Sequence, residues 1–138
     1  MAHHPKFIEA VRLFNEHKFW EAHEALEVLW LADKSPDRAF FQGLIHCAAA
    51  LHHLRLATMR REGRHGEHPA TDAQVLRHLE GARGQWAKAG LRLGPFRPRH
   101  GGIGVDALVD GMARALDGLD EGRAVFRPGN VPELRLED

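Results

Sequence analysis

The chain has 138 residues, a length that indicates one domain and suffices to bury a hydrophobic core. Its 19 Lys and Arg residues balance 19 Asp and Glu residues, so we expect neither nucleic acid nor a membrane as a partner. One cysteine excludes an internal disulfide, and the lack of a signal-like start or a long apolar run predicts a cytoplasmic protein.

Hydrophobic periodicity predicts three helices in the first half of the chain. The first two are expected at about 5–16 and 18–32, and their short connection predicts an antiparallel hairpin. Ser35 is a good N-cap before Pro36, which begins a third helix that extends to about Arg61. Because this third helix is apolar on nearly every side, we expect it at the centre of the fold.

Two more helices are predicted in the second half, and no segment shows the pattern of a strand network. Segment 62–70 is rich in Gly and His, which is typical of an exposed loop. Thr71 and Gln74 form a capping-box pattern that begins a fourth helix at about 72–90. A linker at 91–104, a fifth helix at about 105–120 and an extended tail at 121–138 follow.

These elements predict an all-α fold, a compact bundle of about five helices in which the antiparallel hairpin packs on a buried third helix. Gly43 inside the third helix costs about 1 kcal/mol relative to Ala, which indicates a close helix contact or room for a ligand. We expect a single domain, 1–138, that divides into core helices at 7–61, the loop at 62–70, C-terminal helices at 71–120 and the tail at 121–138.

Two polar residues interrupt the apolar face of the second helix. At about 100° per residue, His23 and Glu27 fall between Trp20 and Trp30, inside the apolar arc. Glu24 lies at the edge of that arc. The side chains of His23 and Glu27 are therefore expected to point from within the predicted core.

A polar stripe runs along the third helix, which is otherwise hydrophobic. Gln42, His46 and His53 lie within about 60° of one another on one side of this helix. Burying these groups without partners would cost on the order of 1–3 kcal/mol each, so they require partners. The nearest candidates are His23 and Glu27 on the second helix.

Three interpretations of this cluster stay open. The first is a structural hydrogen-bond network that fixes the register of the helices. The second is a divalent metal such as zinc, held by His23, Glu27, His46 and His53. The third is acid–base catalysis or ligand anchoring, in which Glu27 raises the basicity of a histidine.

Two hypotheses of function follow, and whether the protein is an enzyme stays open. In the first, a pocket between the second and third helices binds a metal ion or a small polar ligand, with hydrolysis as the reaction considered. Its candidate catalytic residues are His23, Glu27 and Glu24, and its candidate ligand-binding residues are Trp20, Arg38, Gln42, His46 and His53. In the second, the hairpin resembles a tetratricopeptide unit and docks a protein partner or a second copy, and the polar cluster is purely structural.

Motifs in residues 7–56 are similar to those of one helical family. Its pattern, roughly FNxGxFWEAHExLExxW followed by RxFxQGLIQxAAAxxH, matches the sequence from Phe14 to Trp30 and from Arg38 to His53. The chain therefore resembles the uncharacterised family catalogued as domain of unknown function 309 (DUF309). The resemblance implies a compact all-helical fold and implies no established activity.

The chain departs from that family pattern at two informative positions. His17 stands where family members usually carry Gly, and His46 stands where they commonly carry Gln. A Gln at the second position favours a hydrogen-bond network over a metal ligand there. The resemblance therefore makes the second-helix motif, with His23 and Glu27, the stronger candidate for function.

Overall fold

The computed structural model describes residues 3–63 and 72–137, and this part of the chain contains five α-helices. The predicted all-α fold is confirmed. None of the described helices is both long enough and apolar enough to cross a membrane. The helices are α1 (Pro5–Asn15), α2 (Phe19–Ala32), α3 (Asp37–Arg61), α4 (Asp72–Leu93) and α5 (Val105–Ala115).

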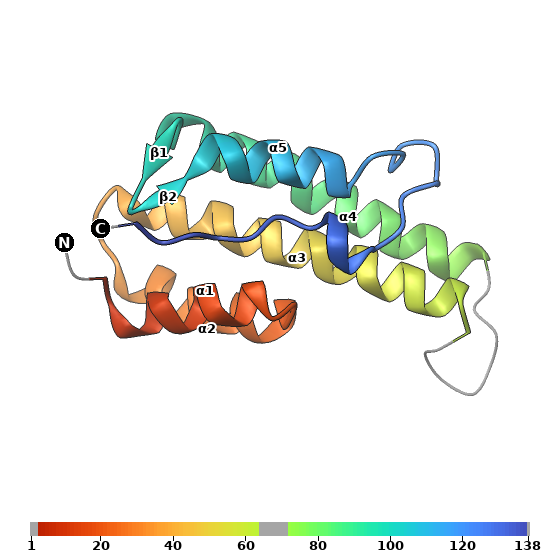
Figure 1. Cartoon of the computed structure of the whole chain (residues 1–138), viewed down its shortest axis with the longest axis horizontal. Coiled ribbons are helices and arrows are strands. Elements are labelled where there is room, and N and C mark those ends of the chain that lie inside the picture. Colours follow the sequence, from red (N-terminus) through yellow and green to blue (C-terminus); the bar gives the residue numbers. More distant parts are fainter. Residues whose placement is uncertain (1–2, 64–71, 138) are drawn as a thin grey trace.

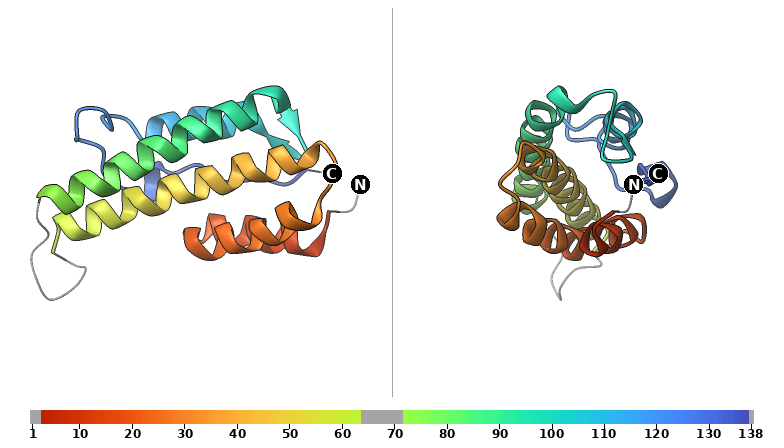
Figure 2. Two further views of the ribbon diagram at one scale, coloured as in Figure 1. Left: turned by 180° about the vertical axis from the view of Figure 1, so that it is seen from behind. Right: turned by 90° about the vertical axis from the view of Figure 1, so that its left-hand side faces the viewer.

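The long helices α3 and α4 form an antiparallel pair, and the shorter elements pack around α3 (Figure 1). The α1–α2 hairpin covers one side of α3, and α5 covers another. The end view in Figure 2 shows α3 surrounded by the other helices and by the C-terminal segment. Its apolar side chains explain this central place, because Phe40, Leu44, Leu51 and Leu54 are each at most 1% exposed.

The end of α1 explains one departure from the family pattern. His17 has a φ of 63°, in the left-handed region where glycine is favoured. Its N–H bonds the carbonyl of Phe14, and the N–H of Lys18 bonds the carbonyl of Leu13, which together form a Schellman motif. The His17 ring stacks on Phe19, with 5.7 Å between the ring centroids. These contacts hold a histidine in a conformation that glycine adopts more readily.

The predicted linker at 91–104 contains a small hairpin that the periodicity did not predict. Strands β1 (Arg99–His100) and β2 (Ile103–Gly104) pair antiparallel. The turn between them is formed by Gly101 and Gly102, both with positive φ (58° and 81°), as in the tight turns that join antiparallel strands. Two residues per strand are too few to show a period-2 pattern, so periodicity gave no sign of this hairpin. The described residues contain no larger strand network, as the sequence predicted.

Two helix boundaries differ from the predicted ones by more than one residue. Helix α4 continues to Leu93, and α5 ends at Ala115 instead of near residue 120. The chain turns after α5 at Gly118, whose φ is 81° and whose carbonyl accepts the N–H of Arg123. The predicted loop at 62–70 falls mostly, and the predicted cap at Thr71 entirely, outside the described residues.

The C-terminal segment 131–137 is extended and runs between α1 and α5 (Figure 1). Asn15 of α1 binds both backbone groups of Leu134: its Nδ2 donates to the carbonyl and its Oδ1 accepts the N–H, each at 2.8 Å. The Leu134 side chain is 3% exposed and belongs to the core. The N–H of Glu137 bonds the carbonyl of Gly102. The segment is therefore fixed on both edges.

Candidate functional site

Four of the residues predicted to converge line one pocket of about 200 Å³. His23 and Glu27 come from α2, and Gln42 and His46 come from α3. Gln85 of α4 also lines this pocket and was not predicted. The remaining lining residues are Trp30, Ile45 and Ala49. The site therefore lies where three helices meet, with polar groups on an apolar wall.

The hydrogen bond between His46 and Gln85 determines which ring nitrogen of His46 carries the proton. The Nδ1–H of His46 donates to Oε1 of Gln85 at 2.7 Å, which leaves Nε2 as the acceptor of the neutral ring. Burial lowers the pKa of His46, and the positive charges of Lys88 and Arg92 lower it further, against the raising effect of Gln85. His46 can therefore accept a hydrogen bond or a proton at Nε2.

The α2 pair forms the other side of the pocket. Nε2 of His23 lies 3.4 Å from Oε1 of Glu27, and the two side chains are 17% and 44% exposed. The ring of Trp20 stacks on His23 at 4.9 Å between centroids and 14° between planes. Nδ1 of His23 is buried and has no hydrogen-bond partner among the described residues. Glu27 is thus an accessible carboxylate beside an imidazole that Trp20 holds in place.

His53 does not join this pocket. Its Nδ1 lies 3.3 Å from Nδ1 of His78 on α4, and its ring packs against Gly81. Nε of Arg60 donates to Nε2 of His78 at 3.2 Å. His78 can therefore donate from Nδ1 to His53. His53 contributes to the contact between α3 and α4.

The other three candidate residues lie around the pocket. Trp20 is half exposed and contacts His23 and His52 rather than the pocket itself. Glu24 is exposed to solvent. Arg38 lies 4.7 Å over the Trp30 ring, and its Nε donates to the carbonyl of Trp30. Arg38 therefore orders one wall of the site from outside.

The geometry does not support the predicted metal set. His23, Glu27 and His46 line the pocket, but His53 is turned to α4. Within residues 3–63 and 72–137, no group of three His, Cys, Asp or Glu side chains is placed to hold a metal ion. The single cysteine, Cys47, is fully buried, and burial raises its pKa to about 12.

Gln85 was missed because nothing in its local sequence marks it. It lies on α4, a helix for which the sequence predicted no site residue. The useful signal was that a partly buried histidine on α3 requires a hydrogen-bond partner. Sequence reasoning sought that partner on α2 alone, whereas the long contact between α3 and α4 supplies it.

Acidification below pH 7 should destabilise the fold through three partly buried histidines. Burial is the main cause that lowers the pKa of His46, His52 and His53 in the folded protein. As the pH falls below about 6.5, the unfolded chain therefore binds protons before the folded chain does. This contribution to stability is complete above pH 6.5 and is lost as the pH falls through the lower folded-state values.

Thermal unfolding followed by circular dichroism between pH 7.5 and 5 measures this effect. We expect the melting temperature to fall over this range and to fall less for a His53→Gln variant. A melting temperature that is constant or rises toward pH 5 contradicts the expectation. Carboxylates are not a confounding factor here, because they titrate mainly near pH 4.

Residues 7–61 match the model of a family described as Domain of unknown function (DUF309). This match covers α1 from its third residue and the whole of α2 and α3, and it contains the pocket residues of α2 and α3. Neither a curated protein nor a solved structure showed significant similarity to the chain.

Proposed function

We propose, from the geometry, that the pocket binds a small polar ligand. The family whose model residues 7–61 match is described without an activity. The observation that carries this proposal is the convergence of Glu27, Gln42 and His46 with Gln85 on one pocket. Buried or half-buried polar groups that retain hydrogen-bonding capacity favour a polar occupant.

The polar side chains of the pocket have unused hydrogen-bonding atoms, and most of these atoms are acceptors. Gln42 has no hydrogen-bond partner within the described residues, and its amide can both donate and accept. His46 offers Nε2, and Glu27 offers a carboxylate that is 44% exposed. A ligand with N–H or O–H donors, such as an amine, an amide or an alcohol, fits these groups.

The size of the pocket restricts the ligand further. About 200 Å³ is below the roughly 300–1,000 Å³ of pockets that hold drug-sized ligands. Trp30 and Ile45 supply apolar walls against which the carbon atoms of such a ligand pack. We propose binding alone and assign neither a metal nor a bond cleavage to the site.

The proposal is tested with a matched pair of glutamates on α2. Saturation-transfer NMR with a library of small amines, amides and alcohols identifies ligands of the wild-type protein. A Glu27→Gln substitution should weaken each of them by about tenfold or more, because a hydrogen bond to a charged group contributes roughly 1.5–3 kcal/mol. Glu24→Gln, on the same helix but exposed and outside the pocket, should leave affinity unchanged.

Changes in the chemical shifts of backbone amides on addition of the ligand locate its binding site. We expect the largest changes at Gln42, His46 and Gln85. The proposal is wrong if no fragment binds with a Kd below about 1 mM, or if the two glutamine variants bind equally well. If Glu27→Gln lowers the melting temperature and no ligand is found, the polar cluster has a structural role only.

A further inference from the structure

Helices α2 and α4 flank α3 on the side of the molecule that faces away from α5 and the C-terminal segment (Figure 2). The polar pocket lies at its centre, lined by Glu27 from α2, His46 from α3 and Gln85 from α4. In the view from behind, no other described element covers this side. We call it the α2–α4 face and define it by the pocket and six exposed residues: Trp20, Glu24 and Leu31 of α2, and Lys88, Leu91 and Arg92 of α4.

The two helices that border this face have charges of opposite sign on it. Helix α2 contains three glutamates and no Lys or Arg. At about 100° per residue, Glu24 lies within about 60° of Glu27 around α2. Lys88 and Arg92 lie within about 60° of Gln85 around α4, counted in the same way. Neither these two cations nor Glu24 forms an ion pair within residues 3–63 and 72–137.

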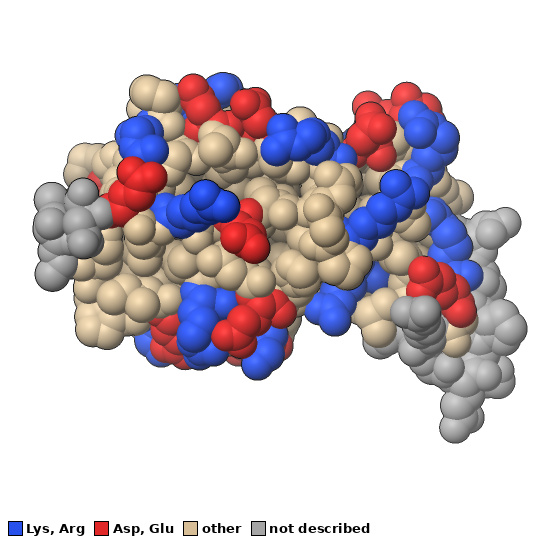
Figure 3. Space-filling model, viewed as in Figure 1, with Lys and Arg blue, Asp and Glu red and all other residues tan. Residues whose placement is uncertain are grey.

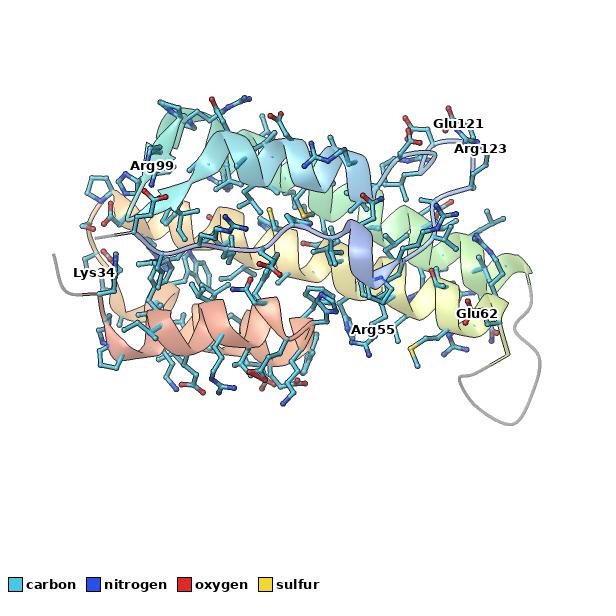
Figure 4. All side chains as sticks on the ribbon, viewed as in Figure 1. Lys34, Arg55, Glu62, Arg99, Glu121 and Arg123 are labelled. Carbon is cyan, nitrogen blue, oxygen red and sulfur yellow. The ribbon has the colours of Figure 1, made fainter. Side chains whose placement is uncertain are left out.

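The opposite side of the protein has no such separation of charge. Figure 3 shows Lys and Arg side chains beside Asp and Glu side chains across that side. Nη2 of Arg99, labelled in Figure 4, lies 2.8 Å from Oε2 of Glu137. Nη2 of Arg123 lies 3.7 Å from Oε2 of Glu121, and both are labelled in the same view. Separate, unpaired charges therefore distinguish the α2–α4 face.

Large hydrophobic side chains are exposed on the same face. Trp20, near the start of α2, is 50% exposed, and Leu31, near its end, is 60% exposed. Leu91 of α4, which follows Lys88 by three positions, is 80% exposed. Exposed apolar groups that are bordered by charged residues are typical of protein–protein interfaces, in which aromatic side chains are enriched.

Contacts with α3 show which residues of α2 and α4 lie at the same level along the helices. Trp20 contacts His52, and the residue after His52 packs against Gly81 of α4. Glu27 shares the pocket with Gln85. Because α2 and α4 both run antiparallel to α3, they run parallel to each other. Residues of α2 therefore lie level with residues about 60 positions later on α4, at 1.5 Å of rise per residue in both.

We propose that two copies of this chain associate through their α2–α4 faces, related by a twofold axis parallel to these helices. This axis places α2 of each copy on α4 of the other and keeps every residue at its own level. Opposite charges then meet along both helix pairs. The other twofold axis in the plane of the face, across the helices, places α2 on α2 and α4 on α4, so that like charges repel.

The levels along the helices specify the contacts between the copies. Glu24 and Glu27 face Lys88 of the second copy. Leu31 faces Leu91 of the second copy. The Trp20 ring packs where α4 of the second copy has no side chain, at Gly81.

This association also closes the polar pocket. The second copy covers the open side of the pocket over Gln42 and His46, and its Lys88 approaches Glu27. A molecule in the pocket is then enclosed by two chains, one of which supplies a cation. The inference does not rest on the function proposed for the pocket, because the two faces are complementary with the pocket empty or filled.

Sedimentation-velocity ultracentrifugation from about 1 µM to 1 mM protein tests the proposal with two charge reversals. Glu24→Lys and Lys88→Glu should each weaken the dimer at least about tenfold, because each brings like charges together twice in the symmetric dimer. A one-to-one mixture of the two variants should associate as the wild type does. In that mixture, both contacts between positions 24 and 88 again join opposite charges.

Two further substitutions control for the change in net charge. Arg127→Glu and Glu133→Lys, at exposed positions near the C-terminus and away from this face, should each dimerise as the wild type does. Leu91→Asp, at a side chain that is 80% exposed, should weaken the dimer without affecting the fold. Far-ultraviolet circular dichroism verifies that every variant is folded.

Three results overturn the proposal. The first is a wild-type protein that stays monomeric up to about 1 mM. The second is a dimer that persists in both Glu24→Lys and Leu91→Asp, since its interface then lies elsewhere. The third is a mixture of Glu24→Lys with Lys88→Glu that associates no better than either variant alone, because the two positions then do not meet.

Discussion

Replacing Asn15 with alanine should lower the free energy of unfolding by about 2–4 kcal/mol, the cost of leaving two partly buried backbone groups unsatisfied. The Asn15 side chain bonds both the N–H and the C=O of Leu134, as a neighbouring strand would. Loss of both bonds also frees the buried Leu134 side chain from the core. Urea unfolding followed by circular dichroism measures the change in stability.

A second asparagine provides the control for this prediction. Asn130 donates from Nδ2 to the carbonyl of Arg114 at 3.3 Å and is exposed, so Asn130→Ala should change stability by no more than about 0.5 kcal/mol. Hydrogen exchange at the Leu134 amide should accelerate in Asn15→Ala alone. Equal stability of the two variants, with the Leu134 amide still protected, contradicts the role assigned to Asn15.

Substituting Gly43 with alanine should also destabilise the fold, by up to about 2 kcal/mol. A Cβ at this position would lie 2.6 Å from Cδ2 and 2.7 Å from Cγ of Leu93, a fully buried side chain of α4. Overpacking of this kind costs about 1–3 kcal/mol, and the better helix propensity of alanine returns at most about 1 kcal/mol. The predicted close helix contact at Gly43 is therefore confirmed as a contact with α4.

Substitution of Gly84 separates the cost of overpacking from the gain in helix propensity. This glycine lies on α4, it is exposed, and a Cβ there would meet nothing within 4 Å. Gly84→Ala should stabilise the protein by up to about 1 kcal/mol through helix propensity alone. If Gly43→Ala stabilises the protein by the same amount in urea unfolding, α3 and α4 do not pack as closely as described.

The angular positions of residues around single helices predicted a large part of the pocket. His23 and Glu27 were placed inside the apolar arc of α2 from angular positions alone, and the structure puts both in the pocket. Gln42 and His46 were placed in the same way on α3. Such positions depend on local backbone geometry, which is the same in every α-helix.

For His53, the angular position around the helix gave the wrong neighbour. This residue lies on the same side of α3 as His46, but seven residues further along the helix, about 10.5 Å away at 1.5 Å per residue. A wheel shows direction around the axis and ignores distance along it. At that distance α4 is the neighbour that His53 contacts, through His78 and Gly81.

Local patterns by themselves determined the helical class, the order of the helices, the central place of α3 and the polar side chains on its buried face. These properties depend on the spacing of residues within single helices, which the amino-acid sequence states directly. Only the tertiary structure decided that Gln85 completes the pocket, that Asn15 binds Leu134 and that α2 and α4 flank the same side of α3. Each of these contacts joins residues far apart in the chain, and their pairing follows from how the helices pack rather than from any local pattern.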